Sequence, residues 1–125
     1  MDYCHKIVCA ALALASLIGT ASAELPAPSG PDLFVRRCSV CHGSTAPTLS
    51  SIGPSLAGII GRKAGTQDSG VHSRAVIDSG IVWDRDSLRR FLAEPPRAIP
   101  GSLMSVGVTN PAELESLLDY LESLR

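Results

Sequence analysis

The chain has 125 residues, of which 45% are hydrophobic and 18% charged, and this length and balance fit one small globular domain. Its formal net charge is −1 and it contains no run of lysine or arginine, which argues against a nucleic-acid-binding protein. Aromatic residues make up only 4% of the chain, so its core has less apolar bulk than usual. A buried apolar non-protein group would supply the apolar volume that the side chains lack.

Residues 1–23 have the pattern of a secretory signal peptide. Lys6 gives a positively charged start, residues 7–18 form an apolar run, and residues 21–23 have the small-x-small form that signal peptidase cleaves. We therefore expect cleavage after Ala23, export to the periplasm and no membrane span in the mature chain. The alternative is a retained membrane anchor, although the apolar run falls short of the ~20 residues that a spanning helix needs.

The mature chain is expected to begin with a flexible lead-in, residues 24–30, which is rich in Pro, Ser and Ala. A helix is predicted from Pro31, because proline suits the first helical positions and Asp32 is an acidic residue in the first turn. Residues 31–125 then form the single predicted domain.

The first helix leads into residues 38–42, which read C-x-x-C-H. This pattern is the attachment site of haem c: two thiols one helical turn apart can add to the two vinyl groups of a haem, and the histidine that follows binds the iron. The other uses of C-x-x-C are half of a zinc site, a redox dithiol and a strained disulfide. Zinc needs more ligands than His72 supplies, a dithiol needs a βαβ context, and a disulfide leaves His42 without a role.

The middle of the chain is predicted to consist of loops and turns. Residues 43–53 contain Ser, Thr and Pro and show no regular period. After the turn at residues 53–56, Gly58, Gly61 and Gly65 suit tight turns or a close approach of the backbone to a flat ligand.

Two helices are predicted in the C-terminal part. The first begins at Asp84 as N-cap, has an apolar face and ends at Pro95, and its arginines are expected to face mostly water. An extended loop, residues 99–108, follows. The last helix has Asn110 as N-cap, Pro111 and Glu113 in its first turn, and one apolar face formed by Leu114, Leu117, Leu118, Leu121 and Leu124. No stretch alternates with period two, so the fold is predicted to be all-α.

Met104 lies in the 99–108 loop and is the one methionine besides Met1. A single methionine commonly fills a gap in a core. Here it lies in a Pro/Gly loop far from the C-x-x-C-H motif, which allows it to approach a haem from the side opposite His42. The sixth iron ligand matters because it separates electron carriers from gas binders and peroxidases.

The order of these motifs resembles that of class I cytochrome c over nearly the whole mature chain. That family has C-x-x-C-H, a G-P-x-L turn, a G-R-K-x-G segment, a Trp, a helix ending in Pro, an I-P-G-x-x-M loop and a C-terminal helix. This chain has them at residues 38–42, 53–56, 61–65, Trp83, Pro95, 99–104 and from Pro111. The resemblance implies the class I cytochrome c fold, with three to five short helices wrapped around one covalent haem.

The resemblance also implies roles for individual residues. Cys38 and Cys41 would carry the thioether links of one haem c, and His42 and Met104 would bind its iron. The Pro54 carbonyl would accept the proton on the distal nitrogen of His42. Arg62, Trp83 and Ser102 look like the family's partners of the haem propionates, although Arg62 alone also suits a surface charge and Trp83 a core aromatic. Residues similar to the family's crossing of first and last helices are Gly30, Phe34, Leu117 and Tyr120.

Three features depart from the mitochondrial members. His72 and Phe91 stand where those members have tyrosines, one near a propionate and one bonded to the methionine sulfur. The family's ring of lysines is reduced to Lys63 in the mature chain. We therefore expect an altered reduction potential and a weak dependence of partner docking on salt.

The resemblance implies an electron-transfer protein and no enzyme: a soluble monomer that carries one electron between redox proteins, such as a membrane-bound oxidase or a dehydrogenase. One alternative is a haem subunit dedicated to a single dehydrogenase or oxidase complex. Another is a gas sensor or peroxidase in which Met104 leaves the iron.

Overall fold

The computed structural model describes residues 26–42, 52–67 and 70–124. Within these residues it is helical and forms no strand, and the β-pairing is a single antiparallel bridge between Lys63 and Val82. The all-α prediction is therefore confirmed. The predicted signal peptide and most of the predicted loop at 43–53 lie outside the described residues. No helix of the described chain is long and apolar enough to cross a membrane.

The chain first forms one helical run made of α1 (Gly30–Leu33), the π-helical turn η1 (Phe34–Cys38) and α2 (Ser39–His42). The run begins one residue before the predicted start, because the Ser29 side chain caps it by accepting a hydrogen bond from the Asp32 backbone N–H at 3.4 Å. Consequently the C-x-x-C-H residues are carried by helical backbone.

Four further helices follow: α3 (Arg74–Asp78), α4 (Arg85–Ala93), α5 (Pro95–Ala98) and α6 (Pro111–Ser123). With the first run counted as one helix, the described residues contain five, which agrees with the three to five predicted. The predicted caps of α4 and α6 are present, since the side chains of Asp84 and Asn110 accept hydrogen bonds from backbone N–H groups of their first turns. Pro95 ends α4 as predicted and also opens α5, while α3 was not predicted.

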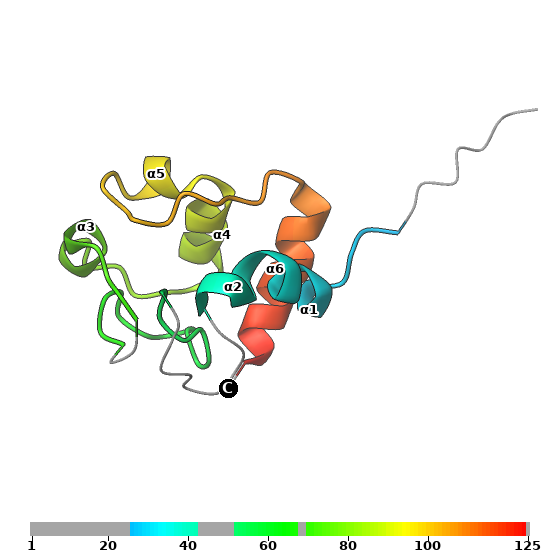
Figure 1. Ribbon diagram of the computed structural model, residues 1–125, viewed down its shortest axis with the longest axis horizontal. Helices are drawn as coiled ribbons and strands as arrows, with labels where there is room; N and C mark the ends of the chain where they lie inside the picture. The colour runs from blue at the N-terminus through cyan, green and yellow to red at the C-terminus, as the bar shows by residue number, and fades with distance from the viewer. Residues whose placement is uncertain (1–25, 43–51, 68–69, 125) are drawn as a thin grey trace, which may run out of the picture.

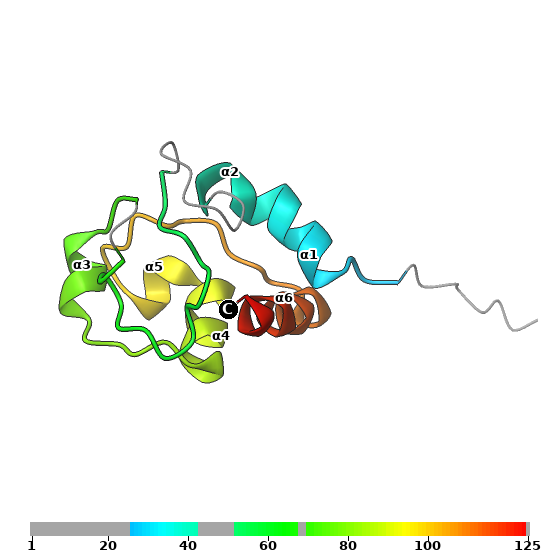
Figure 2. The ribbon, with the colours of Figure 1, turned by 90° about the horizontal axis from the view of Figure 1, so that it is seen from below.

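The first helix crosses the last one, as Figures 1 and 2 both show. Gly30 lies directly on α6: a Cβ built on it would collide with the Ser116 carbonyl oxygen and would lie 2.7 Å from the Tyr120 Cβ. Leu117 is buried at this crossing. Glycine at position 30 therefore permits the close approach of the two helices, as the resemblance implied.

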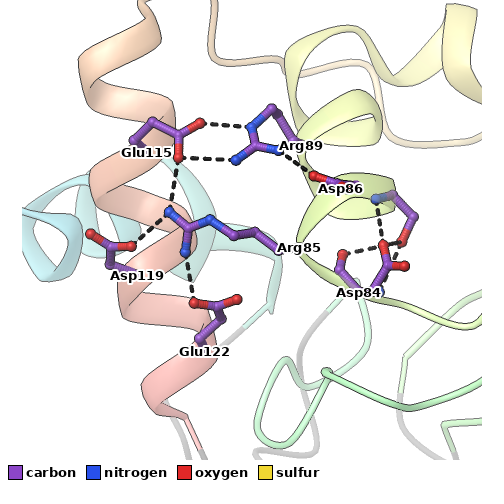
Figure 3. Close-up of polar contacts among 8 residues, drawn as sticks. Asp84, Arg85, Asp86, Arg89, Glu115, Asp119 and Glu122 are labelled. Atoms are coloured by element: carbon purple, nitrogen blue, oxygen red, sulfur yellow. Dashed lines mark hydrogen bonds and ion pairs between the residues drawn. The ribbon is translucent and has the colours of Figure 1, made fainter.

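Ion pairs join α4 to α6 (Figure 3). The Arg85 guanidinium donates to Glu115, Asp119 and Glu122 at 2.6–2.8 Å, and Arg89 donates to Glu115 at 2.7 Å. The expectation that the α4 arginines face water was therefore wrong for Arg85 and Arg89. They lie on the side of α4 that faces the carboxylates of α6.

One core cluster contains residues of all the larger elements, including Cys38, Trp83 and Phe91, and Met104 packs against it while remaining half-buried. In Figure 1 the segment 52–67 (green) runs along the lower edge and the loop between α5 and α6 (orange) runs along the upper edge. The helical run that ends at His42 lies between them in this view.

Candidate haem site

Cys38 and Cys41 are both free thiols in this structure, the first buried and the second half-buried. They lie one helical turn apart across the junction of η1 and α2. Burial raises the pKa of Cys38, and the positive charge of Arg37 partly offsets this. The pair is thus held on one scaffold as separate thiols, which is the state that a thioether-forming site requires.

His42 follows these cysteines, and its Nδ1 lies 2.7 Å from the carbonyl oxygen of Pro54. A carbonyl oxygen can only accept, so Nδ1 carries a proton, and in the neutral ring Nε2 then has the lone pair. The structure therefore holds the imidazole in the tautomer that can ligate a metal through Nε2.

Met104 lies in the loop between α5 and α6, half-buried against the core. Its backbone N–H donates to the Ser102 hydroxyl at 3.2 Å, and the Ser102 N–H donates to the Ile99 carbonyl at 3.0 Å. Ser102 thus shapes the loop that presents Met104. Its own hydroxyl proton is not used in that bond and remains able to donate.

Arg62 and Trp83 are brought together by the backbone. The Trp83 N–H donates to the Arg62 carbonyl at 2.9 Å, and the Gly61 N–H donates to the Trp83 carbonyl at 2.7 Å. The half-buried Arg62 guanidinium donates to the carbonyls of Ala57 and Ser55, the latter at 3.4 Å. These contacts are those of an anchored side chain and differ from those of a solvated surface charge.

Trp83 and Phe91 form the aromatic part of the core beside this segment. Both are buried, with 7% and 8% of their surface exposed, and their ring centroids are 5.2 Å apart at 50°. The Phe91 ring therefore occupies apolar surroundings, where a tyrosine would need a partner for its hydroxyl.

His72 is half-buried, with Nε2 2.9 Å from the Gln67 carbonyl oxygen. This nitrogen donates, by the same argument as for His42. The imidazole of His72 is therefore tied to the backbone at Gln67.

Two glycines of the site carry a role that the sequence reasoning did not assign. Gly53 lies against the His42 ring, and Gly70 lies against the peptide that joins Gly53 to Pro54. The one signal for Gly53 in the sequence is its position directly before Pro54. Nothing in the sequence around Gly70 points to this contact.

The residues present fit a haem and do not fit zinc. Within the described part of the chain, no group of three or more His, Cys, Asp or Glu side chains gathers that could hold a metal ion. Two free thiols on a helix, an imidazole with its Nε2 lone pair available and a half-buried thioether are the donor groups of a covalently attached, six-coordinate haem.

Comparisons with known proteins agree with this donor set, although no protein-family model matches the chain. Cytochrome c2 iso-2 of Magnetospirillum molischianum is 40% identical over 100 residues, which is 79% of this chain and 98% of the relative. Cytochrome c2 of Agrobacterium tumefaciens (strain II Chrys) is 40% identical over 90 residues, covering 69% of this chain and 81% of the relative.

A solved structure is also similar: cytochrome cH from Methylobacterium extorquens superposes with a TM-score of 0.66 at 32% identity, over 75% of this chain and 94% of the neighbour. Identity of 32–40% over 81–98% of the length of these proteins establishes common family and fold. The chain therefore belongs to the class I c-type cytochromes, electron-transfer proteins that carry covalently attached haem c and are not enzymes.

Proposed function

We propose that Cys38 and Cys41 form the thioether links to one haem c, that His42 and Met104 are its axial iron ligands, and that the protein carries single electrons between redox partners in the periplasm. The observation that carries the proposal is the 2.7 Å contact between His42 Nδ1 and the Pro54 carbonyl. It leaves Nε2, and only Nε2, as the ligating atom of the residue that follows the two cysteines.

When bound, the haem supplies the Fe(II)/Fe(III) couple, and the protein supplies position and surroundings. The Pro54 carbonyl fixes the imidazole orientation and makes the ring a stronger donor. Ser102 holds the backbone of Met104 in place through the 3.2 Å bond. With His42 and Met104 as the residues that would hold the iron, no position would be left open for a substrate.

The apolar surroundings contribute to the potential. Trp83 and Phe91 are buried in the same cluster as Cys38, and Met104 packs on this cluster. Exclusion of water from the iron disfavours the more highly charged ferric state, so this environment supports a positive potential.

The proposed location rests on the predicted signal peptide, residues 1–23, with cleavage after Ala23. N-terminal sequencing of the exported protein tests it: a start at Glu24 supports export, and a start at Met1 contradicts it.

We propose that the protein is a free monomeric carrier. Its mature chain contains one lysine, Lys63. Stable co-purification with one dehydrogenase or oxidase would instead indicate a dedicated subunit.

The ligand assignment is tested by absorption spectra of the purified oxidised and reduced protein. We expect a sharp reduced α band and the weak far-red ferric band of methionine-ligated haem. Met104→Ala should abolish the ferric band and allow carbon monoxide to bind the reduced protein, which the wild type resists. A pigment that acid–acetone extracts, or a spectrum that Met104→Ala leaves unchanged, would contradict the proposal. Carbon monoxide binding by the wild type would favour the gas sensor or peroxidase.

A further inference from the structure

The His42 ring packs against a backbone position that has no side chain. A Cβ built on Gly53 would lie 2.7 Å from Cε1 and 2.8 Å from Nδ1 of the imidazole, well inside ordinary contact distance. The φ angle of Gly53 is not in the left-handed region, so backbone conformation does not require glycine here. What requires it is the closeness of the ring.

The Gly53–Pro54 peptide contacts a third segment as well. A Cβ built on Gly70 would collide with the carbonyl carbon and oxygen of Gly53 and with the nitrogen of Pro54. Gly70 also has a positive φ of +77°. The backbone at position 70 therefore lies directly on the peptide that precedes the acceptor carbonyl of His42.

Hydrogen bonds connect the same three segments. The Gly53 N–H donates to the Cys41 carbonyl at 2.7 Å, and the Val71 N–H donates to the Ile52 carbonyl at 3.0 Å. Together with the bond from His42 to Pro54, they join residues 41–42, 52–54 and 70–71 into one unit, here named the glycine stack. Backbone hydrogen bonds and close backbone contacts thus fix the position of each of these three segments against the next.

We infer that Gly53 and Gly70 are positioning residues for His42: the glycine stack sets the distance between Nδ1 and the Pro54 carbonyl and thereby the donor strength of the imidazole. This inference rests on the proposed function, since donor strength affects the iron only if His42 is a ligand. A side chain at either glycine moves the 53–54 peptide, lengthens the bond and weakens the imidazole as a donor. A weaker donor stabilises Fe(III) less and raises the midpoint potential.

The direction of this change separates positioning from general loosening. A structure that merely opens admits water to the haem, which stabilises Fe(III) and lowers the potential.

The test compares the haem-loaded wild type with Gly53→Ala, Gly70→Ala and Gly80→Ala. Gly80 is the matched control, because its φ is +65° and a Cβ there has no neighbour within 4 Å. Alanine at position 80 therefore brings strain without collision.

The first readout is hydrogen exchange of the His42 Nδ1 proton, followed by NMR in the reduced protein. We expect Gly53→Ala and Gly70→Ala to exchange it at least about tenfold faster than wild type, a loss of about 1.4 kcal/mol of protection. The second readout is redox titration, in which both variants should have a raised midpoint. Gly80→Ala should leave the Nδ1 exchange rate and the midpoint potential unchanged. Exchange rates and midpoints of the Gly53 and Gly70 variants equal to those of Gly80→Ala would overturn the inference, as would lowered midpoints.

A measurement on the wild type covers the case in which a variant fails to fold. If the stack opens as one unit, the His42 Nδ1 proton and the amide protons of Gly53 and Val71 share one opening free energy. The opening free energy of each proton follows from its exchange rate relative to that of the same group in a free peptide. An opening free energy for the Nδ1 proton much smaller than that of both amides would contradict the inference. His42→Ala distinguishes the two proposals: an unchanged haem spectrum in that variant defeats the proposed function itself, whatever the glycine variants do.

Discussion

Phe34 of the first helical run and Tyr120 of α6 meet edge to face, with ring centroids 5.3 Å apart and an interplanar angle of 62°. This contact lies one helical turn from Gly30, whose missing side chain allows α1 to touch the α6 backbone at Ser116. Since the same run carries the C-x-x-C-H motif, the crossing fixes the helix of proposed haem attachment to the C-terminal helix.

Gly30→Ala should therefore destabilise the protein. The added methyl group overlaps the Ser116 carbonyl, and overpacking of this kind costs about 1–3 kcal/mol. Urea unfolding of the haem-loaded protein, followed by fluorescence, measures the loss. The control is Val35→Ala on the same run, where the side chain is 64% exposed and a change within about 0.5 kcal/mol is expected. Equal unfolding midpoints for the two variants would show that α1 and α6 can move apart to accommodate the methyl group without a loss of stability.

The elements that the sequence predicted well are those determined locally. The start of α6 follows from Asn110 and Pro111, and its buried face follows from the spacing of its leucines. Helix α3 was missed because its five residues, Arg74–Asp78, are too few to show an apolar period. Its one local signal is the Ser73 cap, which accepts a hydrogen bond from the Val76 N–H at 3.2 Å.

The site was predictable to the extent that it repeats family motifs. The contact between His42 and Pro54 was implied by resemblance, since the spacing of two residues does not determine a tertiary contact. The pairing of Arg85 with Glu115 was missed because the residues are 30 positions apart and a charged side chain on an amphipathic helix is expected to face water. The contact of Gly70 with Gly53 was missed because a glycine carries no sign of what packs against its backbone.

The ion pairs between α4 and α6 predict an acid-sensitive part of the stability. Hydrogen bonds from Arg89 and Arg85 lower the pKa of Glu115 from 4.5 to about 2. A lowered pKa means that the folded state favours the charged form, so the stabilisation is complete above about pH 4.5 and is lost as the pH falls toward about 2. Wild type should therefore be more stable than Glu115→Gln at pH 7, and the difference should shrink through this window.

Urea unfolding midpoints of wild type and Glu115→Gln, measured from pH 2 to pH 7, test this loss of stability. Glu94→Gln serves as control, because Glu94 pairs with Arg97 at 3.2 Å in an exposed position with both side chains more than half exposed. Pairs of that kind contribute little, and its replacement should change stability little at any pH. A difference between wild type and Glu115→Gln that does not change with pH would show that Glu115 stabilises the protein without its charge.

The sparse positive charge predicts weak electrostatic steering. Close to Met104 the exposed side chains include no charged group: Leu103 is 69% and Val106 55% exposed, and Ser105 between them is uncharged. The net charge of the chain is −1. Oxidation of the reduced protein by the anion hexacyanoferrate(III) should therefore depend only slightly on ionic strength.

The double variant Leu103→Lys/Val106→Lys supplies the comparison. It should react faster at low salt, and its rate should fall more steeply as salt is added. A steep fall for the wild type, matching that of the double variant, would contradict the prediction of weak electrostatic steering.

Phe91 predicts a difference at Met104, the proposed methionine ligand of the iron. The ring is buried beside Trp83. The resemblance to mitochondrial members implies a tyrosine at this position whose hydroxyl reaches the methionine sulfur, and phenylalanine has no hydroxyl to donate. A hydroxyl introduced by Phe91→Tyr would be buried and would need a partner, and the Met104 sulfur is the acceptor that the family provides. Since a hydrogen bond changes the donor strength of the sulfur, redox titration should give Phe91→Tyr a midpoint different from that of wild type.

The control is Phe91→Leu, which removes the ring without adding a hydroxyl, so a shift shared by both variants reflects lost packing. Identical midpoints for wild type and Phe91→Tyr would place the Met104 sulfur out of reach of this side chain.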